Sequence, residues 1–323
     1  MKVLLTGGAG YLGSVAARYL LDDGHKVTVL DSLLHGGQAL QGLYTYENFR
    51  FLRGDIRSPE DVDRALESAE AVVHLAAIVG DPACARDPKL SRQVNQEAAL
   101  QVFQACQRKG VKRFIFASTC SNYGKMADPS QLATEESDLQ PVSLYAETKV
   151  AVEKALLDSQ SLGSPSVTVL RFATLFGMSP RMRLDLTVNE FTVDLATKQK
   201  LEVFGQQFWR PYVHVRDAAR AIAQVLGADE SAVDSQVFNV GDTDENYQKG
   251  QLVELIREEI GTPVEITQVP RDEDPRDYRV SFGKIQERLG YQITRTVRDG
   301  IREVLNAHEH GVISEFDNPS YRN

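Results

Sequence analysis

Two side chains with complementary acid–base chemistry stand four residues apart in this chain. They are Tyr145 and Lys149, in the segment Ser-Leu-Tyr-Ala-Glu-Thr-Lys. On a helix this spacing places both on one face. A free phenol has a pKa of about 10, but a neighbouring ammonium stabilises the phenolate and lowers that value. Such a pair could exchange a proton with a hydroxyl group. The competing interpretation is an exposed Tyr and Lys, because the pattern arises often by chance.

The position of the pair favours the chemical interpretation. It follows the apolar run 114–117, which leads directly into Ser118 and Thr119. A hydroxyl at Thr119 would complete the proton relay and hold the reacting oxygen. We therefore expect Thr119, Tyr145 and Lys149 to be catalytic.

A glycine-rich turn follows the first apolar run. In Thr-Gly-Gly-Ala-Gly-Tyr-Leu-Gly, Gly8, Gly10 and Gly13 fit one dinucleotide-binding spacing, and Gly7, Gly10 and Gly13 fit a wider one. Glycines allow a tight turn and close approach of the backbone to a pyrophosphate. The free N–H groups and the positive end of the following helix then face the anion.

An acidic residue completes the pattern. Asp31 stands 18 residues after Gly13, at the end of the second apolar run. A carboxylate there accepts hydrogen bonds from the adenosine ribose and repels a 2′-phosphate, so the sequence predicts NAD rather than NADP. The alternative is a structural turn with a surface Asp.

Short apolar runs alternate with helical patterns in the first half of the chain. This alternation predicts an α/β fold with a doubly wound parallel sheet of the Rossmann type. We expect a NAD-binding domain over residues 1–177, with segments around 208–241 returning to it, and a smaller mixed α/β substrate domain over 178–323. The polar tail, 311–323, is expected to be loosely ordered. The six runs predicted as strands are 3–5, 27–30, 49–52, 72–75, 114–117 and 167–170.

Bulk composition excludes several classes of protein. The net charge of -9 and the lack of any Lys/Arg run argue against nucleic-acid binding. No window approaches the roughly 20 apolar residues of a membrane span, and no signal peptide is recognisable. Three widely spaced cysteines predict neither a disulfide framework nor a metal site. The simplest expectation is a cytoplasmic protein with reduced thiols.

Taken together, these features resemble the extended short-chain dehydrogenase/reductase family of NAD-dependent nucleotide-sugar enzymes. The resemblance spans nearly the whole chain. Besides the glycine turn, Asp31 and the Tyr–Lys pair, it rests on the segments 54–56, 74–77, 118–124, 170–172 and 210–215 and on Asn95.

The resemblance implies roles for further residues. Cofactor contacts are expected from Gly7, Gly10, Tyr11, Leu12, Gly13, Asp31, Asp55, Ile56, Leu75, Ala76, Ala77, Asn95, Ser118, Tyr145 and Lys149. Contacts with a nucleoside-diphosphate sugar are expected from Thr119, Asn189, Arg210, Arg271 and Arg276. It also implies a homodimer formed by helices near 95–108 and 147–160.

Two departures from the family narrow the chemistry. Dehydratases of the family carry Asp-Glu directly after the catalytic Thr, where this chain has Cys120 and Ser121, and decarboxylases place a Glu at the second position. Both reactions are therefore disfavoured, and Cys120 is interpreted as a buried structural thiol. Thr174 replaces a common Asn, and His214 is expected to be structural.

The leading hypothesis is a C4 epimerase that passes through a transient 4-keto sugar. The alternative enzyme is a 4-ketoreductase or dehydrogenase of deoxysugar or antibiotic-sugar synthesis, which would release its cofactor at each turnover. A non-catalytic NAD-sensing or scaffold protein on the same fold is a third possibility, disfavoured by the intact Thr119, Tyr145 and Lys149.

Overall fold

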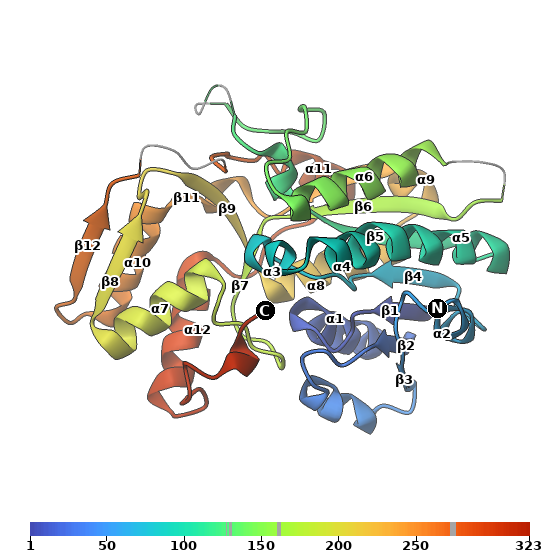
Figure 1. Cartoon of the computed structure of the whole chain (residues 1–323), viewed down its shortest axis with the longest axis horizontal. Coiled ribbons are helices and arrows are strands. Elements are labelled where there is room, and N and C mark those ends of the chain that lie inside the picture. The colour runs from blue at the N-terminus through green and yellow to red at the C-terminus, as the bar shows by residue number, and fades with distance from the viewer. Residues whose placement is uncertain (127, 129–130, 160–162, 272–275) are drawn as a thin grey trace.

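A twisted parallel sheet forms the larger part of the molecule (Figure 1). The computed structural model describes residues 1–126, 128, 131–159, 163–271 and 276–323. Within these residues the sheet has seven strands in the order β10-β6-β5-β4-β1-β2-β3. They are β1 (Lys2–Thr6), β2 (Lys26–Asp31), β3 (Phe49–Arg53), β4 (Ala71–His74), β5 (Arg113–Thr119), β6 (Ser166–Phe172) and β10 (Gln236–Val240).

The predicted doubly wound sheet is confirmed, with one strand more than the six expected from the first half of the chain. The extra strand, β10, pairs in parallel with β6 from Gln236 against Thr168 to Val240 against Phe172. Strand β4 is buried along its whole length. In the sequence, such strands are unbroken apolar runs, because both faces of the sheet are covered.

Helices cover the two faces of the sheet with separate apolar cores. On one face lie α1 (Tyr11–Asp22) and α8 (Val215–Gly227), which pack against each other. On the other face lie α2 (Pro59–Ala65), α5 (Ala99–Lys109) and α6 (Leu144–Asp158). Helix α6 begins where the Ser143 hydroxyl accepts the Ala146 N–H, which fixes the helix that carries the Tyr–Lys pair.

One helical stretch on the second face contains an irregular turn. It runs through α4 (Pro88–Arg92) and the π-helical turn Gln93–Ala98 into α5. A π-turn holds one extra residue and often marks a functional site. This one carries Asn95, which is 1% exposed.

The smaller part of the molecule has its own core and two small sheets. Strands β7 (Thr174–Phe176), β9 (Trp209–His214) and β11 (Asn246–Gln248) form one, and β8 (Lys200–Phe204) pairs with β12 (Glu265–Val269) in the other. Helices α7 (Thr187–Lys198), α10 (Lys249–Ile260) and α12 (Val297–Glu309) enclose the core. The remaining helical segments are α3 (Asp81–Arg86), α9 (Glu230–Val233), α11 (Gly283–Leu289) and the short turns 38–45, 120–123, 243–245 and 319–321.

A buried ion pair joins α6 to β6. The Arg171 guanidinium lies 2.8 Å from the Glu153 carboxylate, and the two side chains are 5% and 1% exposed. Glu153 also accepts hydrogen bonds from Ser118 and Asn122. Removing the charge of one partner leaves the other buried without compensation, which is strongly destabilising.

We expect Glu153→Gln to lower the free energy of unfolding by about 3–5 kcal/mol, because Arg171 would keep its charge without a buried counterion. Urea denaturation measures the change. The matched control is Glu254→Gln, which removes an exposed pair with Arg257 and should cost less than about 1 kcal/mol. Equal effects of the two substitutions would contradict this account.

Candidate functional site

The candidate site lies where the direction of strand order reverses. Strand β1 pairs with β2 on one side and β4 on the other, so a crevice opens beyond the carboxyl ends of β1 and β4. Gly7 adopts a φ of 74° in the turn after β1, and a Cβ there would lie 2.7 Å from the Ala76 nitrogen. The glycine turn and the loop after β4 therefore touch, which only a glycine permits at this position.

The start of α1 is left open to an anion. Its first helical residue is Tyr11, its N-cap Gly10 has no side chain to accept a hydrogen bond, and its first turn has no acidic residue. The first N–H groups of a helix need acceptors, and here no side chain provides a cap. This arrangement suits a phosphate group.

Asp31 stands beside this turn. Its carboxylate accepts hydrogen bonds from the N–H groups of Ala9, at 3.0 Å, and Leu33, at 2.8 Å. Burial raises the pKa of the carboxyl group, while the two hydrogen bonds oppose that rise. Asp31 is thus placed at the end of β2, against the glycine turn, as the sequence predicted.

Hydrogen bonds with Thr6 and Asn95 fix the loop after β4. The Ala76 N–H donates to the Thr6 hydroxyl, and Leu75 N–H to the Thr6 carbonyl. Asn95 pairs its amide with both main-chain groups of Ile78, at 2.7 and 2.9 Å. The Asn95 side chain therefore holds this loop in place from within the protein.

The structure places Asp55 and Ile56 in the loop after β3. Asp55 forms a bidentate pair with Arg57, and Ile56 is buried. Their contacts with a cofactor remain predictions.

The Tyr–Lys pair lies on one face of α6. The Lys149 ammonium is 5.9 Å from the centre of the Tyr145 ring and donates to the Ala117 carbonyl at 2.8 Å. It also lies over the Phe116 ring at 4.7 Å. Burial lowers the pKa of Lys149 to about 8, an effect that the Glu153 carboxylate opposes. An ammonium at this distance can stabilise a phenolate once the phenol has given up its proton.

In the ligand-free protein the phenol itself is held protonated. Burial raises the pKa of Tyr145, and the nearby Cys84 and Asp81 raise it further, while Arg183 acts in the opposite direction. Additional positive charge is needed beside the ring before it can act as a base. The oxidised nicotinamide ring carries such a charge.

The two hydroxyls at the end of β5 point to opposite sides, as strand geometry requires. Thr119 is partly exposed, and its oxygen lies 2.9 Å from the Ser121 hydroxyl. Ser118 is 4% exposed and donates to Glu153 beneath the site. Only the main chain of Ser118 remains for the expected cofactor contact.

Cys120 is a buried thiol, as interpreted from the sequence. Its side chain is 1% exposed and donates to the Arg171 carbonyl at 3.2 Å. Burial raises the pKa of the thiol well above its ordinary value. Cys120 therefore offers the site neither an acid nor a base.

Four residues are expected to contact the substrate without being catalytic, and the structure places them in different surroundings. Arg210 is 7% exposed and lies over the Tyr278 ring, 5.5 Å from its centre, and Arg276 pairs with Asp81 at 3.0 Å. Arg271 is exposed. Asn189 is fully buried, and both N–H groups of its amide are used by Arg183, Gly177 and Tyr11. Its amide has no donor left for a substrate and instead fixes a loop.

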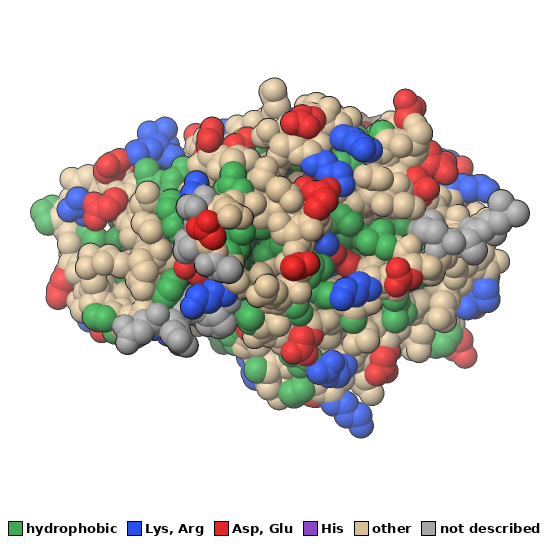
Figure 2. Space-filling model, turned by 90° about the horizontal axis from the view of Figure 1, so that it is seen from above, with side chains coloured by type: hydrophobic (Ala, Val, Ile, Leu, Met, Phe, Trp, Pro, Cys, Tyr) green, Lys and Arg blue, Asp and Glu red, His purple; other side chains and the backbone are tan. Residues whose placement is uncertain are grey.

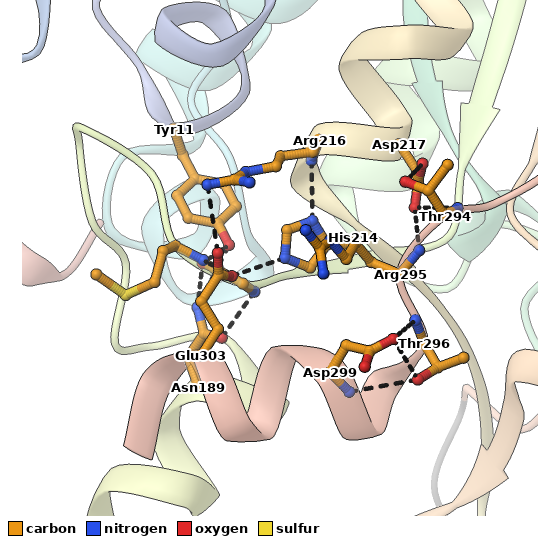
Figure 3. A network of polar contacts seen from close by, with 12 residues as sticks. Tyr11, Asn189, His214, Arg216, Asp217, Thr294, Arg295, Thr296, Asp299 and Glu303 are labelled. Atoms are coloured by element: carbon orange, nitrogen blue, oxygen red, sulfur yellow. Dashed lines mark hydrogen bonds and ion pairs between the residues drawn. The ribbon is translucent and has the colours of Figure 1, made fainter. Parts of the chain in front are cut away.

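A polar network that the sequence did not indicate fixes the loop after β7 (Figure 3). The Tyr11 phenol donates to the Gly177 carbonyl at 2.6 Å, and Glu303 of α12 accepts the Met178 N–H at 3.0 Å. Glu303 also bonds His214, whose other ring nitrogen accepts the Arg216 N–H. His214 is thus a structural residue, as expected, and its Nε2 donates to Glu303. No local sequence motif could have revealed partners this far apart in the chain.

Three further observations on the described residues concern membrane spanning, metal binding and surface charge. Their helices include none with the length and apolar character to cross a membrane. No group of metal-binding side chains is found in this part of the chain. On the face in Figure 2, basic side chains are interspersed with acidic ones.

Fold and site together define a Rossmann-type, dinucleotide-dependent enzyme with a Tyr–Lys pair. The family model for the NAD dependent epimerase/dehydratase family matches residues 3–241. The chain belongs to this family, and it is an NAD-dependent enzyme.

Relatives agree with this assignment over nearly the full length. The chain is 30% identical to a UDP-glucose 4-epimerase of Corynebacterium glutamicum, over 90% of each protein. It resembles a UDP-glucose 4-epimerase of Thermus thermophilus in complex with NAD, with a TM-score of 0.83, 28% identity and coverage of 97% and 100%. It also resembles a dTDP-glucose 4,6-dehydratase of Streptomyces venezuelae with NAD bound, with a TM-score of 0.85, 26% identity and coverage of 98% and 100%.

NAD fits the residues present. The close-packed glycine turn, the uncapped start of α1 and the Asp31 carboxylate are what a dinucleotide pyrophosphate and an adenosine ribose require. We expect the turn to hold the phosphates, Asp31 the ribose, and Tyr145 and Lys149 to adjoin the nicotinamide end. The bound cofactor supplies a reversible acceptor for two electrons.

The lowered pKa of Lys149 has a consequence for stability. Between pH 8 and the ordinary Lys value of 10.5, the unfolded chain binds a proton that the native protein has released. The free energy of unfolding due to this residue therefore rises with pH in that window, by about 1 kcal/mol per pH unit. We therefore expect the free energy of unfolding of the cofactor-free wild type, measured by urea denaturation, to rise with this slope relative to that of Lys149→Met.

Lys89→Met, at an exposed position, is the control and should show no such slope. A difference between wild type and Lys149→Met that stays constant from pH 8 to 10.5 would mean that burial does not perturb this ammonium.

Proposed function

We propose that this protein is a C4 epimerase of a nucleoside-diphosphate sugar, acting through a transient 4-keto sugar. The observation that carries the proposal is the composition of the site. Thr119, Tyr145 and Lys149 supply a proton relay, but the two positions after Thr119 hold a buried thiol and a hydroxyl. A site that oxidises and reduces without an added acid and base suits epimerisation rather than loss of water.

Each residue has a defined task in this scheme. Tyr145 takes the proton of the sugar hydroxyl and later returns it. Lys149, held by the Ala117 carbonyl, stabilises the phenolate in between. The Thr119 hydroxyl orients the reacting oxygen. When bound, NAD would supply a reversible two-electron acceptor, so no external redox partner would be consumed.

Dehydration would need a carboxyl group that protonates the leaving hydroxyl. The carboxylate of Asp81 is the one that influences Tyr145, and it is paired with Arg276 at 3.0 Å. The Arg276 guanidinium occupies this carboxylate, so it is not free to face a leaving hydroxyl. This contact supports epimerisation over the dehydratase reaction named for some relatives.

The nucleotide end of the substrate is assigned to Arg210, Arg271 and Arg276. Guanidinium groups bind phosphates through charge-assisted hydrogen bonds. We place the reaction in the cytoplasm, where the free thiols Cys84, Cys106 and Cys120 would stay reduced.

The test is product analysis by NMR with UDP-glucose, dTDP-glucose and GDP-mannose as trial substrates. We expect one of them to be converted to its C4 epimer without added cofactor and without net oxidation or reduction. Stoichiometric reduction or oxidation that depends on added cofactor would instead establish the ketoreductase or dehydrogenase.

Tyr145→Phe should lower the epimerisation rate by about 10²–10⁴-fold, because it removes the acid–base group and keeps the ring. Tyr44→Phe removes a phenol that is 67% exposed and should leave the rate unchanged. Full activity of Tyr145→Phe would rule out this mechanism.

We also propose that the protein is a homodimer that uses α5 and α6. The two helices lie side by side on one face of the sheet. Their outer sides carry partly exposed apolar residues, including Leu100, Ala151 and Leu157. A four-helix contact of this kind would cover them.

Light scattering should give twice the mass of one chain. Leu100→Glu should shift the protein to monomers, because it places a charge in the proposed contact. The control Leu34→Glu alters a leucine that is 75% exposed and should leave the dimer intact. A monomeric wild type would refute this proposal.

A further inference from the structure

The end of the described chain is firmly attached, although its polar composition predicted a loose tail. Residues 321–323, called the strap below, lie in the region between the two parts of the molecule, near β7 and α3 (Figure 1). The Tyr321 carbonyl accepts the Leu184 N–H at 2.8 Å, and the Asn323 N–H donates to Asp185 at 3.2 Å. The strap therefore follows the loop that leads into α7.

The same strap also contacts the loop after β4. Arg86 of α3 donates to the Asn323 carbonyl at 2.7 Å, and the Asn323 amide lies 3.5 Å from the Val79 carbonyl. Two residues beyond Val79, Asp81 pairs with Arg276 of the smaller part. The loop 79–86 is thus held from across the crevice at three points.

Both loops border the expected cofactor crevice. Helix α3, within the first loop, packs against α6, the helix that carries Tyr145. The second loop begins at Gly177, whose carbonyl accepts the Tyr11 phenol beside the glycine turn. The strap therefore joins two loops that adjoin the site.

A buried cation fastens the middle of the strap. Arg181 is 6% exposed and donates its Nη2 to the Arg322 carbonyl at 2.9 Å. Its Nε and Nη1 have no hydrogen-bond partner among the residues that the structure describes. The nearby Asp185 carboxylate is occupied by Arg183. Because a buried guanidinium without acceptors is costly, the strap carbonyl is important for the stability of this loop.

The loop that carries Arg181 is itself fixed to the glycine turn. The Ser179 hydroxyl donates to the Tyr11 carbonyl at 2.7 Å and lies 3.2 Å from the Ser14 hydroxyl. Through these bonds the strap is connected rigidly to the start of α1, where the cofactor phosphates are expected.

We propose that the strap is a wall of the active site that keeps the cofactor and the oxidised sugar in place during turnover, with Arg86 and Asn323 as its positioning residues. The part of this inference that concerns the sugar rests on the proposed epimerase. An epimerase needs such retention, since the sugar must turn between oxidation and reduction without leaving.

The cost of losing the strap follows from the electron balance. Oxidation breaks the C4–H bond and the O–H bond of the sugar. The two electrons and the hydrogen pass to NAD, and the proton passes to Tyr145. If the keto sugar escapes at this stage, one reduced nicotinamide is left behind for each ketone released. The amount of keto sugar that escapes can therefore be measured as reduced nicotinamide.

The first experiment needs no sugar. Purified protein is loaded with NAD, and exchange against isotopically labelled NAD is followed by rapid filtration. Deletion of residues 321–323 should speed exchange at least about tenfold, because several hydrogen bonds to charged groups are lost. Arg86→Gln should also speed exchange, by a smaller factor, with an unchanged melting temperature. Exchange at the wild-type rate in both variants would overturn the inference.

Arg18→Gln is the matched control. Arg18 is exposed on α1 and pairs with Asp22, so its substitution removes the same charge away from the crevice. If it speeds exchange as much as Arg86→Gln does, the effect is one of net charge and the strap has no positioning role.

The second experiment uses whichever sugar nucleotide the wild type epimerises. In Arg86→Gln and in the variant that lacks residues 321–323, reduced nicotinamide and free 4-keto sugar should accumulate in equal amounts, and kcat should change by a larger factor than KM. Absence of both products would overturn the sugar part of the inference. If the wild type epimerises no sugar, the proposed function fails, while the exchange measurement still decides the role of the strap.

Discussion

The hydrogen bond from the Tyr11 phenol to the Gly177 carbonyl joins the two parts of this molecule at the point where both are needed. Tyr11 opens the helix that is expected to face the cofactor phosphates, and Gly177 opens the loop that leads into the smaller part. Asn189 and Glu303 hold the neighbouring atoms of that loop. Because all these groups are buried or half-buried, each lost bond would leave a polar group unsatisfied. These bonds therefore fix the orientation of the smaller part relative to the larger one, at a point next to the glycine turn.

A second polar layer lies directly under the catalytic face. Glu153 neutralises Arg171, accepts from Ser118 and raises the pKa of Lys149 against the effect of burial. This carboxylate has both a structural and a chemical role. Its charge holds β6 to α6, and it also favours the protonated form of the buried Lys149 ammonium. The hydrogen bonds within this cluster offset part of the cost of burying its charges.

Much of the larger part could be predicted from the sequence, because parallel strands and a glycine turn have local signatures. The six apolar runs, the helix of Tyr145 and Lys149, and Asp31 at the end of β2 all fall where their patterns placed them. Asn189 was expected at the substrate, since a polar residue near a site looks the same in sequence whether it faces in or out. The tail was expected to be loose because its partners, Arg86, Arg181 and Leu184, are supplied by distant parts of the chain.

The widened turn at Gln93–Ala98 constrains how this protein can change. The turn holds one residue more than a regular helix, and Asn95 within it reaches back to both main-chain groups of Ile78. Loss of a single residue there would restore regular winding and leave the helix on either side in phase, but it would remove the widened turn on which Asn95 is placed. The amide would then no longer hold the loop at Ile78. Length in this stretch is therefore as strictly required as residue type, and insertions or deletions should be far rarer here than in the surface turns nearby.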